Sequence, residues 1–157
     1  MQDSIICGVD GSPDSLHALR IAAKLARRLD ARLVAAHVAD PSGAAFAYAG
    51  VGAAASLGRA PVLLTDPEVE REAVVAILTR SVIDAEEEIA ERRVLSGNPA
   101  ESLADLADEE EAMLIVVGSR GRGAFKTAFL GSVSNSLIGI ARCPVLVVPQ
   151  GAVEAAE

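Results

Sequence analysis

The chain has 157 residues, a net charge of −8 and only 3% aromatic residues. Its length fits one domain with a buried core, and 51% hydrophobic residues are too many for an intrinsically disordered chain. The acidic balance and the scarcity of aromatic rings weigh against nucleic-acid binding, which needs cationic faces and stacking platforms. A local anion pocket is still compatible with this charge, because such a pocket depends on the groups nearest to it.

The cysteines and the apolar runs bear on the compartment. Cys7 lies in an apolar run and Cys143 precedes a proline, without CxxC spacing, so both are interpreted as small buried residues in a reducing compartment. The amino-terminal segment has an early acid and only a short apolar stretch, so no signal peptide is expected. No apolar run approaches the roughly 18 residues that span a bilayer. We expect a cytoplasmic protein without a membrane partner.

The amino-terminal part predicts a strand, a helix and a second strand. Ser4–Val9 is a continuous apolar run, typical of a strand buried on both faces. Ser12 can cap a helix that starts at Pro13, where a missing N–H costs nothing. The second strand is predicted at Arg32–Val38. The apolar positions of the helix are Leu16, Leu19, Ala23, Ala26 and Leu29.

The middle of the chain begins with a long segment, Pro41–Asp66, which is rich in Ala and Gly and is interpreted as a loop. Asp66-Pro67 then opens a predicted long helix, and Arg92–Ser96 follows as a third strand. Asn98-Pro99 opens a shorter helix. Its inward positions are predicted to be Leu103, Leu106 and Ala107.

The carboxy-terminal part predicts strands at Ala112–Gly118 and Pro144–Val148, separated by a helix that starts near Ser132. Strands and helices therefore alternate, which predicts a parallel sheet with helices on both faces. We expect an α/β fold, a single doubly wound domain over residues 1–150 with a five-stranded sheet of order 3-2-1-4-5, and a frayed tail at 151–157. The apolar positions of the last helix are Val133, Leu137 and Ile140.

Ligands bind such sheets outside the carboxyl ends of the strands. This rule places four segments around one site. They are Asp10–Ser12, Val38–Asp40, Gly97–Pro99 and the loop after Gly118.

The loop from Gly118 to Ser132 is glycine-rich and cationic, and no Asp or Glu occurs from Ala112 to Gln150 although the chain holds 22 of them. Its glycines permit positive φ and close backbone approach, and the following helix offers free N–H groups and a positive dipole end. The Ser132 hydroxyl can donate to a phosphate oxygen or cap the helix. These features predict a phosphate site, to which Arg120, Arg122 and Lys126 add positive charge.

The glycine spacing matches neither GxxxxGK[ST] nor GxGxxG. It is Gly118-x2-Gly121-x9-Gly131-Ser132, and this pattern resembles the ATP-binding branch of the universal stress protein family. Four further segments support the resemblance in the family's order. They are GVDGS (Gly8–Ser12), AHV (Ala36–Val38), SGNPAESL (Ser96–Leu103) and CPVLVVP (Cys143–Pro149).

The resemblance implies a nucleotide-dependent sensor or switch in the stress response, with ATP as ligand and Mg²⁺ held mainly by phosphates and water. Asp10 and the backbone around Gly8 and Val38 would hold the adenine and ribose. Ionised Asp10 only accepts hydrogen bonds, so we expect it at the end of the site opposite the arginines. The triphosphate would be wrapped, largely by main-chain N–H groups, by Gly118, Ser119, Arg120, Gly121, Arg122, Gly123, Gly131, Ser132, Val133 and Ser134.

The resemblance also implies a homodimer in which the strand at Val145–Val148 pairs with its twin across a two-fold axis. This strand is apolar on both faces and is expected at a sheet edge, where an uncovered strand invites pairing. Pro144 and Pro149 bracket it and would limit the ladder to a few residues. The sequence names no downstream protein partner.

Other functions stay open. Phosphoryl transfer needs a positioned base or nucleophile, and the sequence offers none, so no catalytic residue is assigned and ATP hydrolysis is expected to be slow at most. The same pocket could take AMP or cyclic AMP. The chain could also be a dimeric adaptor that uses no nucleotide.

Single residues have structural interpretations as well. Asp10 could cap the first helix or tie down its loop, and Ser119 could be a turn residue. Arg120 and Arg122 could be solvated surface charges. His37, on a buried strand, is interpreted as an interior histidine whose ring has a partner. The acidic runs Ala85–Arg93 and Asp108–Glu111 are most simply exposed helix faces.

Overall fold

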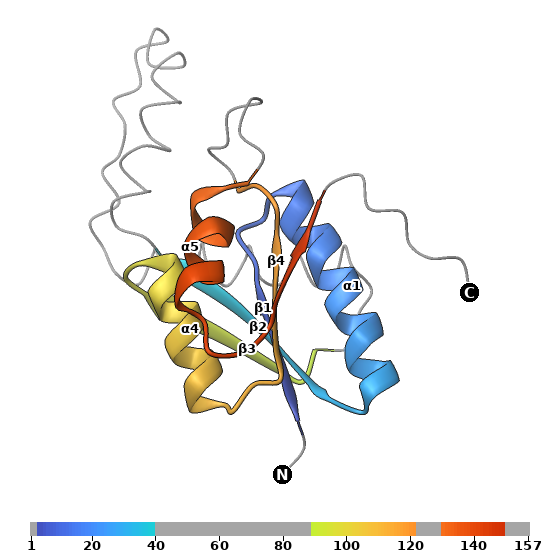
Figure 1. Cartoon of the computed structure of the whole chain (residues 1–157). Coiled ribbons are helices and arrows are strands. Elements are labelled where there is room, and N and C mark those ends of the chain that lie inside the picture. The colour runs from blue at the N-terminus through green and yellow to red at the C-terminus, as the bar shows by residue number, and fades with distance from the viewer. Residues whose placement is uncertain (1–2, 40–88, 122–129, 150–157) are drawn as a thin grey trace, which may run out of the picture.

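Five parallel strands form one sheet in the computed structural model, and helices cover both of its faces (Figure 1). The order β3-β2-β1-β4-β5 confirms the predicted doubly wound α/β fold. The structure describes residues 3–39, 89–121 and 130–149, so the predicted loop Pro41–Asp66, the helix opened by Asp66-Pro67 and the tail lie outside the described residues. The strands are β1 (Ser4–Gly8), β2 (Arg32–Ala39), β3 (Glu91–Ser96), β4 (Leu114–Gly118) and β5 (Val145–Val148).

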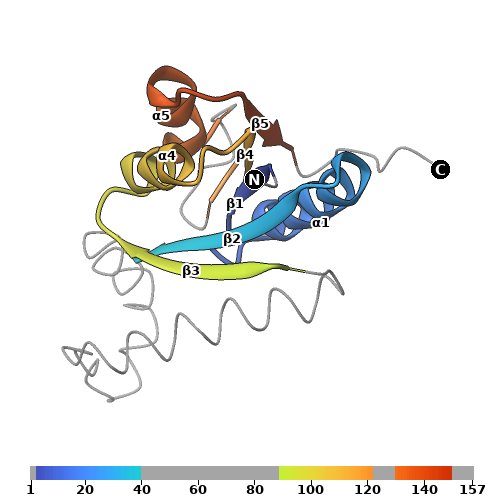
Figure 2. The same cartoon turned by 90° about the horizontal axis from the view of Figure 1, so that it is seen from below.

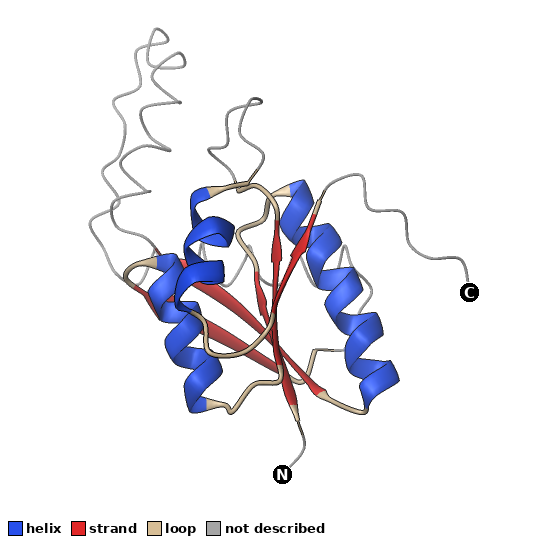
Figure 3. Cartoon of the chain, in the orientation of Figure 1, coloured by secondary structure: helices blue, strands red, loops and turns tan. Residues whose placement is uncertain are grey.

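The described helices are α1 (Pro13–Leu29), α4 (Pro99–Glu109) and α5 (Ser132–Ile140), and Figure 3 shows them in blue beside the red strands. As predicted, Ser12 caps α1, because its hydroxyl oxygen accepts from the Ser15 N–H at 3.2 Å. Asn98 caps α4 in the same way, through the N–H groups of Ala100 and Glu101.

The start of α5 differs from the other two. Gly131 occupies the cap position and provides no side-chain hydrogen bond. Ser132 is therefore the first helical residue, and the possibility that it caps the helix is wrong. Because glycine has no side chain to satisfy them, the first N–H groups of α5 keep their capacity to bind another acceptor.

The sheet buries a separate apolar layer on each face. Successive residues of a strand point to opposite sides, so Ile5 and Cys7 of β1 pack with α1 while Ile6 packs with α4 and α5. Figure 2 shows α1 on one side of the sheet and α4 with α5 on the other. As predicted, both faces of β5 are apolar, with Leu146 and Val148 toward α1 and Val145 and Val147 toward α4 and α5.

Three expectations about these elements need correction. Leu29 and Ile140 are 48% and 47% exposed, although both were predicted on the apolar side of their helices. Each is the last residue of its helix, past the part that packs on the sheet. β4 starts at Leu114 instead of Ala112, because the Ala112 N–H closes the end of α4 by donating to the Ala107 carbonyl oxygen at 2.8 Å.

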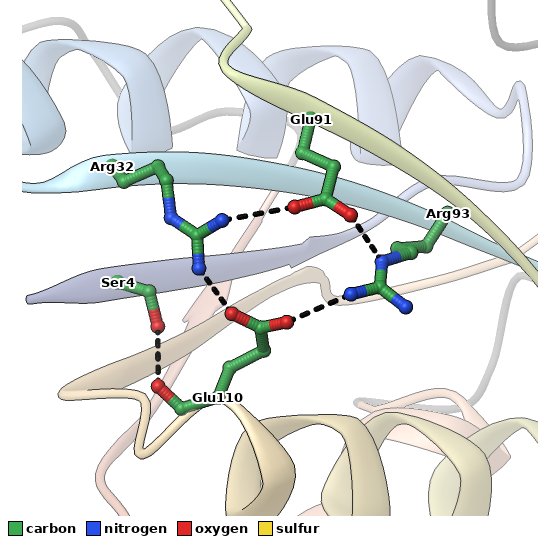
Figure 4. A network of polar contacts seen from close by, with 5 residues as sticks. All are labelled: Ser4, Arg32, Glu91, Arg93 and Glu110. Carbon is green, nitrogen blue, oxygen red and sulfur yellow. Dashed lines mark hydrogen bonds and ion pairs between the residues drawn. The ribbon is translucent and has the colours of Figure 1, made fainter.

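A ring of four charges ties β2, β3 and α4 together near the amino ends of the two strands (Figure 4). Arg32 and Arg93 each contact both Glu91 and Glu110, and the Arg32–Glu91 and Arg93–Glu110 contacts are both 2.9 Å. The Glu110 side chain is only 14% exposed. The interpretation of the acidic runs as exposed helix faces is therefore wrong for Glu91, which lies on a strand, and for Glu110.

Candidate functional site at the carboxyl ends of β1 and β4

The sheet order reverses between β1 and β4, so the candidate site lies outside the carboxyl ends of these two strands. Asp10 follows β1, and Ser119 to Gly121 follow β4. Arg122 and Gly123 lie outside the described residues, as does Lys126. Arg120 is exposed.

Gly131 brings the two ends of the glycine pattern into contact. Its N–H donates to the Ser119 carbonyl oxygen at 2.6 Å. A Cβ atom on Gly131 would lie 3.3 Å from that oxygen and 3.4 Å from the Arg120 Cα. Its φ of −71° suits any residue, so the close space, and not the backbone conformation, is what favours glycine at this position. The start of α5 is thus held against the segment that leaves β4.

Several groups expected to bind phosphate are used within the protein instead. The Ser119 N–H donates to the Val148 carbonyl oxygen at 2.8 Å, and the Arg120 N–H donates to Asp14 at 3.1 Å. The Ser119 hydroxyl also donates to Asp14, at 2.8 Å. The buried Ser134 hydroxyl donates to the Gly131 carbonyl oxygen at 3.0 Å. These N–H and hydroxyl groups donate to acceptors within the protein, so they hold the loop in shape and are not directed at a ligand.

A smaller set of donors fits an anion at this place. It consists of the N–H groups in the uncapped first turn of α5, the Gly121 N–H and the exposed Ser132 hydroxyl. The first turn comprises Ser132, Val133 and Ser134, and its first i to i−4 bond is made only by Asn135, to the Gly131 carbonyl oxygen at 3.0 Å.

Asp10 lies against this loop. Its Oδ1 accepts from the Ser12 N–H at 2.8 Å, and a Cβ atom on Gly121 would lie 2.8 Å from its Oδ2. Asp10 lies beside the Gly121 backbone because β1 and β4 are neighbours and the residues that follow them meet. That it lies at the end of the site opposite the arginines stays a prediction, since Arg122 is outside the described residues. Asp10 does not cap α1, since Ser12 does, but it does tie down the turn before that helix.

The remaining predicted residues lie along the strand ends. A Cβ atom on Gly8 would lie 2.9 Å from Leu103 Cδ1, so β1 approaches the Leu103 side chain of α4 closely at this position. Val38 is half-buried near the end of β2. His37 has the expected partner, because its Nδ1 lies 2.7 Å from the Val9 carbonyl oxygen, but the residue is half-buried and not interior as expected.

Asp14 is the site residue that sequence reasoning missed. It is the second residue of α1, where an acid ordinarily indicates only a favourable interaction with the helix dipole. The residue is 5% exposed, and its carboxylate accepts hydrogen bonds from the Ser119 hydroxyl and the Arg120 N–H. No local sequence pattern predicts this contact, because 105 positions separate Asp14 from Ser119.

The described residues contain no group of three or more His, Cys, Asp or Glu side chains that could hold a metal ion. Within the same residues, no helix is long and apolar enough to cross a membrane.

Similar proteins show the family of this chain. The sequence model of the universal stress protein family matches residues 1–149. This chain belongs to the universal stress protein family. A universal stress protein of Thermus aquaticus is 32% identical, over 94% of this chain and 99% of its own length. A universal stress protein of Mycobacterium tuberculosis is 34% identical over 93% of this chain, which spans only 44% of that longer relative.

Solved universal stress proteins share the fold. One, determined in complex with cAMP, has a TM-score of 0.65 and 27% identity, and the match covers 95% of this chain and 98% of that one. Another, from Archaeoglobus fulgidus and in complex with dAMP, has a TM-score of 0.58 over 94% of this chain and 98% of that one. At 19% identity the second comparison bears on the fold alone.

Proposed function

We propose that this universal stress protein binds ATP at the carboxyl ends of β1 and β4 and acts in the cytoplasm as a nucleotide-dependent sensor or switch. The observation that carries the proposal is the contact of Gly131 with Ser119 and Arg120, which sets the uncapped start of α5 beside the loop after β4. Backbone N–H groups at a helix start, with the helix dipole behind them, favour a phosphate group.

The acidic and basic side chains of the site suggest how the nucleotide is oriented. Asp10, as an acceptor, suits the ribose hydroxyls near Gly121, with Val38 and the backbone at Gly8 toward the adenine. The phosphates would then lie on the N–H groups of Ser132 to Ser134, with Gly123 and the side chains of Arg120 and Arg122 around them. Mg²⁺ would be held mainly by phosphate oxygens and water.

Efficient hydrolysis is not part of the proposal. Oδ2 of Asp14 already accepts two hydrogen bonds, so it is poorly placed to take a proton from water. We expect turnover on the order of one per minute or less, against a typical enzyme median near 10 per second.

A mononucleotide is the second candidate. One observation favours it: three N–H groups expected for a triphosphate, those of Ser119, Arg120 and Gly131, are occupied within the protein. The relative determined with cAMP is 27% identical. The affinities for AMP and cyclic AMP must therefore be measured beside that for ATP. If none of the three nucleotides binds, the chain is better interpreted as an adaptor that uses no nucleotide.

We also propose a homodimer through Val145–Val148. β5 is an edge strand, and Val145, Leu146 and Val147 are only half-buried within one chain. The neighbouring helix α5 exposes Ile138 to 57%. Pairing of β5 with its twin would cover an apolar edge that otherwise invites aggregation.

The deciding experiment is native mass spectrometry of the purified protein, followed by calorimetry with ATP, AMP and cyclic AMP. Gly131→Val should weaken ATP binding by at least about tenfold, or about 1.4 kcal/mol, because it forces α5 away from the loop. Gly139→Val is the matched control, since a Cβ atom there meets nothing within 4 Å. Unchanged ATP affinity in Gly131→Val would remove this loop from the site, and tighter binding of AMP than of ATP would favour the second candidate.

A further inference from the structure

One carboxylate oxygen of Asp14, on α1, accepts two hydrogen bonds from the residues that follow β4. Asp14 Oδ2 accepts from the Ser119 hydroxyl at 2.8 Å and from the Arg120 N–H at 3.1 Å. The side chains of Asp14 and Ser119 are both buried. The hydrogen bond to Asp14 directs the Arg120 N–H at α1. The other side of this backbone lies close to Gly131, because a Cβ atom built there would be 3.4 Å from Arg120 Cα and 3.6 Å from the Gly121 nitrogen.

We propose that Asp14 is a positioning residue of the nucleotide site, and that the site depends on its hydrogen-bond acceptor and not on its charge. The inference rests on the proposed function and adds a residue to it. Asp14 touches no ligand in this proposal. It sets the separation between the two halves of the glycine pattern, by anchoring one half to α1 while Gly131 anchors the other half to Ser119.

The charge itself works against the ligand. Asp10 and Asp14 place two carboxylates beside a site for an anion, and a buried negative charge repels a phosphate more strongly than an exposed one does. Both hydrogen bonds end on the same oxygen, so an asparagine amide oxygen in that position can accept both. Asp14→Asn therefore separates the two contributions, because it keeps the acceptor and removes the charge.

Calorimetry with ATP and AMP tests the proposal on the intact chain. Asp14→Ala should weaken ATP binding by about tenfold or more, since both bonds to the loop are lost. Asp14→Asn should bind ATP at least as well as the unmodified protein and should raise its preference for ATP over AMP, because ATP carries more negative charge. Asp105→Ala, an exposed acid on α4, is the matched control and should change neither affinity. An Asp14→Asn protein that binds as poorly as Asp14→Ala would overturn the inference.

Amide hydrogen exchange without nucleotide gives an independent measurement. The Arg120 amide should exchange about tenfold faster in Asp14→Ala and should stay protected in Asp14→Asn. Ser119→Ala serves if Asp14→Ala does not fold, and it should retain the Arg120 protection because Asp14 still accepts from that N–H. If the unmodified protein binds no nucleotide, the proposed function fails, while the exchange rate still decides what holds the loop. The role of Asp14 is contradicted if the Arg120 amide loses its protection in Ser119→Ala. It is also contradicted if that amide keeps its full protection in Asp14→Ala.

Discussion

Gly118 and Asp14 approach each other so closely that a Cβ atom on Gly118 would lie 2.8 Å from the Cβ of Asp14. The same atom would lie 2.7 Å from the Asp14 carbonyl carbon and 2.9 Å from the Ser15 nitrogen. The end of β4 is thus packed directly on the backbone of the first turn of α1. This contact lets the Asp14 carboxylate reach the two donors that follow Gly118.

Gly118→Ala should destabilise the fold by about 1–3 kcal/mol, because the obstructing atoms are two backbone atoms and the Asp14 Cβ, none of which can swing aside. Urea unfolding followed by circular dichroism measures the change. Gly139→Ala is the control, and it should be neutral or stabilising by up to about 1 kcal/mol, since it sits in open space on a helix. An unchanged urea midpoint for Gly118→Ala would show that the first turn of α1 moves freely.

Asp10→Ala should weaken ATP binding by about tenfold while leaving inorganic triphosphate nearly unaffected, because the carboxylate is proposed to accept from the ribose and not from phosphate. Competition calorimetry with the two ligands measures the difference. Asp10→Asn retains an oxygen for the Ser12 N–H and so controls for the turn before α1. Equal losses for both ligands would mean that Asp10 only ties down its own loop.

Val147→Lys should dissociate the proposed dimer, because it places two like charges near the two-fold axis of a paired β5. Light scattering at high micromolar concentration, with and without ATP, reports the mass. Val94→Lys is the matched control, since Val94 is 40% exposed on β3 at the opposite edge of the sheet. A monomeric unmodified protein under these conditions contradicts the dimer.

Burial raises the pKa of the Cys7 thiol from 9.0 to about 12. The unfolded chain therefore releases this proton near pH 9, whereas the folded chain keeps it. The contribution of Cys7 to stability is complete below pH 9 and is lost as the pH rises toward 12, at about 1.4 kcal/mol per pH unit. Between pH 8 and pH 11, the free energy of unfolding measured in urea should fall less steeply with pH for Cys7→Ala than for the unmodified protein.

Cys143→Ala is the control for this pH dependence. Desolvation also raises the pKa of the Cys143 thiol, but that residue is only partly buried, so its removal should change the slope less. Parallel declines in Cys7→Ala and the unmodified protein would show that the Cys7 thiol ionises without unfolding.

The sequence by itself determined the order of elements and much of the core. Apolar runs such as Ser4–Val9 and the caps at Ser12 and Asn98 are local patterns, because strand alternation and helix capping involve residues a few positions apart. The glycine spacing from Gly118 to Ser132 likewise indicated the family and the place of the candidate site.

Only the tertiary structure decided which groups in that site are available. The N–H groups of Ser119, Arg120 and Gly131 look equivalent to those of Ser132 and Val133 in the sequence, yet they are bonded within the protein. The position of Asp10 against Gly121 and the contact of Asp14 with Ser119 depend on β1 and α1 lying beside β4. Contacts across about a hundred residues follow from chain packing, and no local spacing encodes them.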